Sequence, residues 1–163
     1  MAGQIEAKLA SMGLSVPEPV APLAAYVPAV QTGNLIFVSG QLPLGPDGLA
    51  TGHLTSVDHA DGAPQPGSKV ATAQDAARVC ALNLLAHVKA MTGDLDNVSR
   101  VVKLTGFVNC DASFTQQPQV VNGASEFIGT LFGDAGQHAR AAVGCSSLPL
   151  GAIVEVEGIF EIA

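Results

Sequence analysis

The chain has 163 residues, of which 48% are hydrophobic and only 13% are charged. This length fits one domain, and no apolar run is long enough to cross a bilayer. The net charge of −7 and the pI near 4.8 exclude the basic surface that a nucleic-acid partner requires. So low a charged fraction predicts an oligomer that covers part of the apolar surface.

The cysteines and the N-terminus bear on the compartment. Cys80, Cys110 and Cys145 are an odd number without metal-type spacing, which is typical of reduced core residues in a cytoplasmic protein. The first 13 residues lack the apolar core of a signal peptide, so we expect no export. The four histidines show no ligand spacing either, and no metal site is predicted.

The N-terminal half contains fewer regular elements than the rest. Apolar residues at helical spacing predict a short helix over residues 4–13, followed by an extended, proline-rich arm that begins at Pro17. Residues 34–40, rich in β-branched and aromatic side chains between two glycines, predict the clearest early strand. Residues 45–68 are dominated by Gly, Pro, Asp, Ala and Thr and predict a surface excursion with at most one short extended piece.

Helices and strands alternate in the remainder of the chain. Apolar residues that recur every three or four positions predict a helix of about six turns over residues 70–91. A strand over 101–108 follows, and Pro118 suits the first turn of a second helix over 118–132. Two strands, 139–146 and 152–162, close the chain.

This order predicts an α+β fold in which two helices cover one face of a single sheet. The other face is then free for a partner subunit. We expect one domain over residues 1–163, with residues 1–25 as an N-terminal helix and extended arm. On the first long helix, we expect His87 to lie on an exposed face.

Arg140 is the most informative side chain, because it is one of only seven basic residues and sits in an apolar run. An arginine keeps its charge and presents a planar fork of donors that matches a carboxylate. In the last strand, Glu155, Glu157 and Glu161 share one face by alternation. If the last two strands pair as a hairpin through residues 146–151, Arg140 lies at the end far from that connection.

Simpler interpretations of these residues stay open. Arg140 can be an edge-strand charge and the glutamates a solvated face. Ser39 follows the strongest strand without a clear His and acid partner, so it can simply end a turn. Tyr26, the single tyrosine, can be a packing residue, and His138 either contacts a site at Arg140 or only starts the strand.

Several segments together resemble the Rid family, also known as YjgF or endoribonuclease L-PSP, from about Tyr26 to the C-terminus. They are Tyr26, the run from Gly33 to Pro43, Asn122–Glu126, Ala139–Val143 with Leu148-Pro149, and Val154–Glu157. The resemblance implies a chorismate-mutase-like fold, assembled as a homotrimer around a central barrel of sheets with three clefts between subunits. It also implies hydrolysis of reactive enamines and imines, such as 2-aminoacrylate, to 2-keto acids and ammonia without a cofactor. The N-terminal helix and the long excursion are similar to the family's subgroup with an extended N-terminus.

By the same resemblance, Arg140 would clamp the substrate carboxylate and Glu155 would activate water and pass protons. Four further positions match residues that lie near the ligand in the family: Tyr26, Ser39, Gly40 and Asn122. Ala142 stands where many active members carry a cysteine, which leaves the choice of substrate open. The acidic chain fits poorly with a ribonuclease. A non-catalytic trimer that binds 2-keto acids remains the alternative, because Arg140 would serve it equally well.

Overall fold

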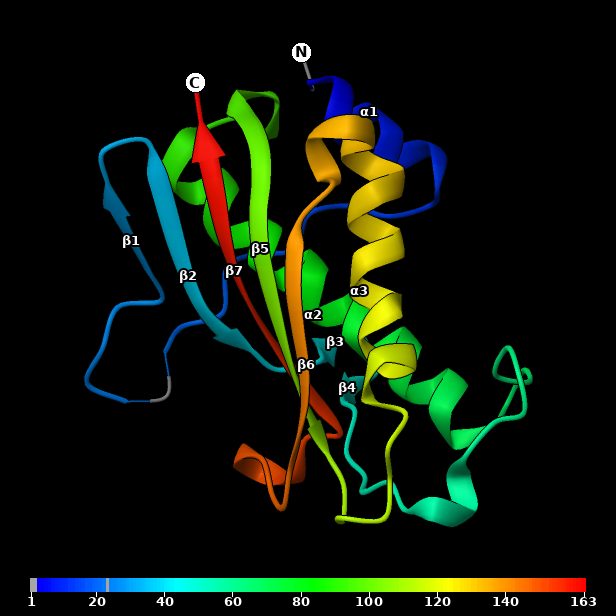
Figure 1. Ribbon diagram of the computed structural model, residues 1–163. Coiled ribbons are helices and arrows are strands. Elements are labelled where there is room, and N and C mark those ends of the chain that lie inside the picture. The colour runs from blue at the N-terminus through cyan, green and yellow to red at the C-terminus, as the bar shows by residue number, and fades with distance from the viewer. Residues whose placement is uncertain (1–2, 23) are drawn as a thin grey trace.

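The structure is a computed structural model that describes residues 3–22 and 24–163. Met1, Ala2 and Leu23, which belong to the expected N-terminal helix and arm, lie outside the described residues. A five-stranded sheet in the order β1-β2-β7-β5-β6 forms one layer, and the two long helices α2 and α3 cover one of its faces (Figure 1). The strands of this sheet are β1 (Ala29–Thr32), β2 (Leu35–Gln41), β5 (Val98–Asn109), β6 (Ala139–Cys145) and β7 (Val154–Ile162). The helices are α1 (Gln4–Ser11), α2 (Lys69–Thr92) and α3 (Gln117–Phe132). The expected α+β architecture with two helices on one sheet face is confirmed.

The pairing of the last two strands differs from the hairpin expected from the sequence. Leu104 of β5 pairs with Arg140 of β6 on one side and with Gly158 of β7 on the other. The strand β5 therefore separates β6 from β7, and the hairpin interpretation is wrong. A parallel neighbour such as β6 needs a crossover connection after β5, and α3 provides it. Residues 146–151 then carry the chain past the end of β5 to its other edge.

Helix α2 is buried on more than one side because it packs against both the sheet and α3. Its ends follow ordinary capping rules: Ser68 Oγ accepts the Ala71 amide at 3.2 Å, and Gly93 adopts the left-handed conformation with φ 78°. His87 is only 3% exposed, so the expectation that it lies on an exposed face is wrong. Its ring faces strand β2, where Nε2 lies 3.2 Å from Oε1 of Gln41, because α2 packs against β2 as well as against α3.

Helix α3 approaches α2 closely at Gly123. A Cβ atom at this position would collide with the main-chain carbonyl of Gln74 in α2. The Gln74 side chain also crosses the contact, because its Nε2 donates to the carbonyl of Gln119 at 2.7 Å. This contact fixes the position of α3, which lies over β5 and β6 (Figure 1).

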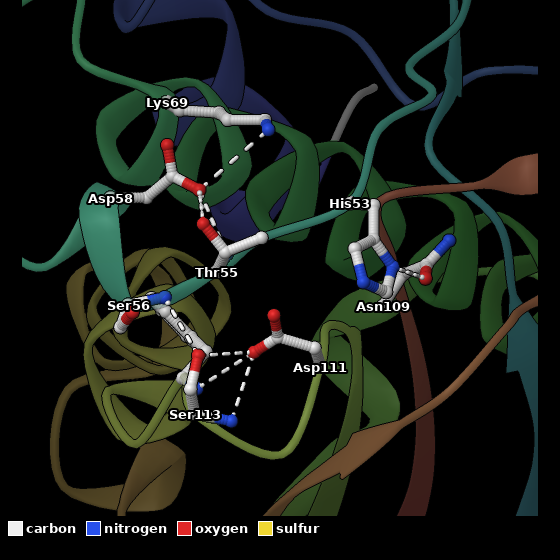
Figure 2. Close-up of polar contacts among 9 residues, drawn as sticks. His53, Thr55, Ser56, Asp58, Lys69, Asn109, Asp111 and Ser113 are labelled. Atoms are coloured by element: carbon white, nitrogen blue, oxygen red, sulfur yellow. Dashed lines mark hydrogen bonds and ion pairs between the residues drawn. The ribbon is translucent and has the colours of Figure 1, made fainter.

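The excursion over residues 45–68 is tied to the loop that follows β5 (Figure 2). It contains the two-residue strands β3 (Leu44–Gly45) and β4 (Gly48–Leu49), so it has more extended structure than expected. His53 Nδ1 lies 2.7 Å from Asn109 Oδ1, and the Ser56 amide donates to Ser113 Oγ at 3.1 Å. Leu54 forms a bridge with Cys110. The segment is thus ordered by contacts with residues 109–116.

Within residues 3–22 and 24–163, no helix combines the length and apolar character that crossing a membrane requires.

Candidate functional site

The guanidinium of Arg140 is held by side chains of α3. Its Nη1 donates to Asn122 Oδ1 at 2.7 Å and to Ser125 Oγ at 3.2 Å. The Ser125 hydroxyl lies 2.9 Å from His138 Nε2, and His138 Nδ1 lies 2.6 Å from the Gly136 carbonyl. Because a carbonyl only accepts, the proton of a neutral His138 resides on Nδ1, and Nε2 accepts from Ser125. A continuous chain of hydrogen bonds therefore orients the arginine.

Three of the five N–H donors of Arg140 stay free for a ligand. Both hydrogens of Nη1 are used, while Nη2 and Nε make no hydrogen bond to the described residues. Among these residues, no carboxylate lies within 4 Å of the guanidinium. The side chain is exposed on the edge strand β6. An oriented, unneutralised guanidinium with a free edge can bind a carboxylate through two parallel hydrogen bonds.

Glu155 lies on the sheet face that α2 and α3 leave open. Its neighbours Val154 and Val156 are fully buried beneath the helices, and the alternation of β7 turns the half-buried Glu155 the other way. Burial, and secondarily the nearby Glu157, raise the pKa of the Glu155 carboxyl. A raised pKa makes this carboxylate a better proton acceptor than an exposed glutamate, as a general base requires.

Gly40 makes room for the Glu155 carboxylate. Strand β2 shifts register against β7 between Val38 and Gln41, and Gly40 lies within this bulge. A Cβ atom on Gly40 would collide with the carboxylate oxygen of Glu155. The glycine is therefore required by the close approach of that side chain, and any larger residue would displace it.

A short hydrogen-bond network shapes the bulge. The amide and the hydroxyl of Ser39 both donate to the carbonyl of Pro28, at 2.9 and 3.1 Å. Gln41 Nε2 donates to the Ser39 carbonyl at 3.2 Å, so its Oε1 faces and accepts from His87 Nε2 at 3.2 Å. Burial lowers the pKa of His87, which keeps this imidazole neutral. Ser39 lies within β2 and not in a turn, and its hydroxyl fixes the backbone by donating to a carbonyl. No histidine or carboxylate hydrogen-bonds to this hydroxyl among the described residues.

Tyr26 lines a pocket together with Gly40. The tyrosine is 48% exposed and comes from the extended arm that precedes β1. The pocket has a volume of about 130 Å³ and opens beside the bulge. Glu155 lies on the other side of Gly40, so Tyr26, Ser39, Gly40 and Glu155 form one neighbourhood, which we call the β2 group.

Arg140 and Asn122 form a second neighbourhood, the β6 group, on the helix-covered face of the sheet. Arg140 pairs with Leu104 and Glu155 with Phe107, three residues apart on β5. Strand geometry then separates the two positions by about 10 Å along the sheet and about 10 Å across it. The six residues predicted from the sequence therefore do not converge within one protomer.

Three residues that support the site, Ser125, Gln41 and His87, were not predicted from the sequence. Ser125 shares the face of α3 that carries Asn122, and its spacing of three residues was the signal that could have identified it. Gln41 directly follows Gly40, but its hydrogen bonds to Ser39 and His87 depend on the packing of α2 against β2. No sequence pattern indicates that pairing.

Known proteins share this architecture over nearly the whole chain. The family model described as "YjgF/chorismate_mutase-like, putative endoribonuclease" matches residues 6–162. Protein TCP17 of Trypanosoma cruzi is 44% identical over 162 residues, which cover 98% of this chain and 95% of that protein. The RutC family protein y4sK of Sinorhizobium fredii is 33% identical over 137 residues, 84% of this chain and 86% of that one. The crystal structure of Atu1372 from Agrobacterium tumefaciens, a protein of unknown function, has a TM-score of 0.82 and 45% identity, covering 98% and 94% of the two chains. The chain therefore belongs to the YjgF family and has its chorismate-mutase-like fold.

Proposed function

We propose that the protein is an enamine/imine deaminase that hydrolyses small 2-imino acids to 2-keto acids and ammonia without a cofactor. The observation that carries this proposal is the guanidinium of Arg140. It is oriented by Asn122 and Ser125, lacks a carboxylate partner among the described residues and keeps Nη2 and Nε free. A bidentate hold on the substrate carboxylate would fix the adjacent imine carbon for attack.

The chemistry needs little beyond positioning and one proton relay. Water adds to the imine carbon and one of its protons moves to the nitrogen, which gives a carbinolamine. The remaining hydroxyl proton then moves to the nitrogen as the C=O bond forms and the C–N bond breaks, which releases ammonia and the 2-keto acid. Glu155 is the group that we assign to this relay, since its raised pKa favours proton uptake from water. A covalent nucleophile is unnecessary because the imine is itself reactive.

The division into a β2 group and a β6 group supports a site between protomers. A small substrate held by Arg140 meets Glu155 only if the β6 group of one protomer faces the β2 group of another. The open sheet face carries exposed apolar side chains suited to such an assembly, among them Val30, Phe37 and Val143 at 52%, 42% and 44% exposure. We propose a homotrimer, a closed ring in which each protomer supplies one of each group.

The test is pyruvate release from 2-aminoacrylate generated enzymatically in the same cuvette. We expect the wild type to accelerate release above the spontaneous rate, Arg140→Ala to abolish the acceleration, and Glu155→Ala to retain a weak remnant. Arg78→Ala is the matched control. Arg78 pairs with Asp75 on the surface of α2, so this variant removes one positive charge at a position away from the site. Absence of acceleration at any concentration, together with calorimetric binding of 2-keto acids, would instead identify a binding protein. Absence of both would refute the assignment of Arg140.

A further inference from the structure

A separate hollow lies at the ends of β5 and β6, apart from both the β2 group and the β6 group. Its volume is about 530 Å³, within the range of about 300–1,000 Å³ that is typical of small-molecule pockets. Four segments contribute to it: the excursion, the loop after β5, the first turn of α3 and the end of β6. Its polar and sulfur-bearing side chains are His53, Cys110, Asp111, Gln117, Cys145 and Ser146. The described lining contains none of the six residues predicted from the sequence, and we call it the His53 hollow.

The imidazole of His53 presents one hydrogen-bond acceptor that no described residue uses. Asn109 Nδ2 donates to the carbonyl of Ala152 at 3.0 Å, so Asn109 Oδ1 faces His53, whose Nδ1 lies 2.7 Å away. Because an amide oxygen only accepts, Nδ1 of the neutral imidazole carries the proton and Nε2 keeps its lone pair. No hydrogen bond to this Nε2 comes from the part of the chain that the structure describes.

Asp111 contributes a second acceptor, which is charged. Its Oδ1 accepts from the amide and the hydroxyl of Ser113, at 2.9 and 2.6 Å, and from the Phe114 amide at 3.2 Å. The hydrogen bond from the Ser113 hydroxyl, more than any other contact, lowers the pKa of Asp111, so the carboxylate is ionised at neutral pH. Its other oxygen has no contact in Figure 2, and no Lys, Arg or His nitrogen of the described residues lies within 4 Å of the carboxylate.

The rest of the hollow offers little to an anion. Gln117 Nε2 already donates to the Phe114 carbonyl at 2.7 Å and to Cys110 Sγ at 3.7 Å. Burial raises the pKa of the Cys110 thiol, which therefore stays uncharged. No lysine or arginine is among the described residues that line the hollow. The lining thus combines one negative charge with an unused lone pair, which suits a positively charged ligand with N–H groups.

We propose that the His53 hollow binds a small organic cation that carries a guanidinium or amidinium group. Such a group is planar, stays charged at neutral pH, and presents several N–H donors and no acceptor. It can therefore donate to the Asp111 carboxylate and to Nε2 of His53 at the same time, whereas a carboxylate or phosphate would meet like charge and unshared lone pairs. The net charge of −7 adds a long-range attraction for cations. This binding is independent of the deaminase reaction, because the hollow shares no residue with the proposed active site.

Calorimetry with the full chain at low ionic strength measures the binding of benzamidine and agmatine. We expect a Kd below about 1 mM for both cations. Benzamide has nearly the shape of benzamidine without its charge, so it is the ligand control and should not bind measurably. If neither cation binds at concentrations up to about 10 mM, or if benzamide binds as tightly as benzamidine, the inference is wrong.

Two variants assign the binding to the hollow. Asp111→Asn keeps the size of the side chain and removes its charge, so the affinity for benzamidine should fall at least about tenfold. Asp47→Asn is the matched control, because Asp47 is an exposed aspartate between β3 and β4 and lies outside the lining. Its affinity should equal that of the wild type. Equal affinities of Asp111→Asn and the wild type would overturn the assignment, and thermal unfolding verifies that both variants are folded.

A spectroscopic measurement on the wild-type protein does not depend on how Asp111→Asn folds. Long-range ¹H–¹⁵N correlation distinguishes the two nitrogens of each imidazole, and His53→Gln identifies the signals of His53. We expect the free protein to carry the His53 proton on Nδ1, and the Nε2 signal to move to lower frequency when benzamidine donates to it. A proton on Nε2 in the free protein, or a shift confined to the other histidines, would contradict the inference.

A free ligand and an arginine of a partner protein present the same guanidinium group, and a peptide separates the two sources. Acetyl-glycyl-arginyl-glycinamide carries this group on a main chain that has to remain outside the hollow. Weaker binding of the peptide than of agmatine supports a small-molecule ligand. Tighter binding of the peptide would assign the hollow to a partner protein and overturn the small-molecule assignment.

Discussion

The guanidinium of Arg140 and the carboxylate of Glu155 project from opposite faces of one sheet. Arg140 turns toward α3, where Asn122 and Ser125 hold it, whereas Glu155 turns away from the helices and packs against Gly40. The register of β5 with both neighbouring strands excludes a rearrangement that would bring them together, because a shift by one residue would expose the buried valines of β7. Joint action of these two groups on one small molecule therefore requires two protomers.

The orientation of Arg140 depends on Asn122. Replacing Asn122 by Ala removes the 2.7 Å hydrogen bond and leaves only the longer one to Ser125, at 3.2 Å, to orient the guanidinium. Loss of one charge-assisted hydrogen bond predicts a rise in KM of about tenfold with a smaller change in kcat, measured on 2-imino acids. Glu126→Ala, at an exposed position of the same helix, is the control and should leave KM unchanged. An unaltered KM in Asn122→Ala would show that the guanidinium needs no support from α3.

Glu155→Gln should separate activity from stability. If Glu155 relays protons, kcat falls about 100-fold. The folded protein has a raised Glu155 pKa, so it binds more protons than the unfolded chain between the two pKa values. The free energy of unfolding therefore decreases as the pH rises through the folded pKa, and the glutamine variant should lack this decrease. Denaturant unfolding of the wild type and Glu155→Gln from pH 4 to pH 8 measures how the free energy of unfolding changes with pH, with Glu18→Gln in the exposed arm as the control. If Glu155→Gln were less stable than the wild type at neutral pH, the predicted sign of this change would be contradicted.

Two glycines of α3 offer a matched pair for the packing of the helices. Gly123→Ala places a methyl group against the main chain of Gln74, and overpacking of this kind costs about 1–3 kcal/mol. Gly129→Ala meets no atom within 4 Å and should gain up to about 1 kcal/mol from helix propensity. Urea unfolding of the two variants measures both changes. Equal stabilities would mean that α3 can move away from α2 at no cost.

His87 gives the fold a pH dependence of the opposite sign. Burial lowers its pKa, so below about pH 6.5, the ordinary histidine value, the unfolded chain binds a proton that the folded protein refuses. The free energy of unfolding therefore falls as the pH decreases from that value toward the folded pKa. His87→Gln keeps a donor for Gln41 without a titrating group and should flatten the curve between pH 7 and pH 5. An identical slope in the variant would assign the effect to another residue.

Local sequence patterns predicted the helices and strands of the fold. They did not predict which strands pair with each other. The apolar spacing of residues 70–91 and the proline at 118 predicted α2 and α3, because both signals lie within one helix. The partner of β6 was misassigned because the short link after Cys145 resembles a hairpin connection. The Ala- and Gly-rich β6 instead occupies the edge, and β7, with its fully buried valines, takes a central place.

Prediction of the site has the same limit, since patterns within one element do not indicate how it lies against another. Arg140 stood out from its apolar surroundings, and the resemblance to relatives supplied Glu155, Tyr26 and Asn122. Neither route indicates that Arg140 and Glu155 are on opposite faces, because alternation within each strand says nothing about its neighbour. The support from Gln41 and His87 was hidden for a similar reason, since it joins a sheet and a helix that lie 46 residues apart in the chain.

Mixed assemblies test whether Arg140 and Glu155 act across a subunit boundary. Arg140→Ala and Glu155→Gln subunits, carrying different affinity tags, are co-expressed, and the assemblies that contain both tags are purified. If each site takes its arginine from one protomer and its carboxylate from the next, every mixed trimer regains one intact site, about a third of the wild-type activity.

If both groups came from one protomer, every site in a mixed trimer would carry one lesion and no activity would return. Each variant expressed alone supplies the baseline. A second control mixes Arg140→Ala with Arg140→Lys subunits, where no arrangement restores an arginine beside a carboxylate. Recovery confined to the first mixture would thus locate the chemistry at the boundary between protomers. Only there can an arginine on the helix-covered face of one sheet lie opposite a carboxylate on the open face of another sheet.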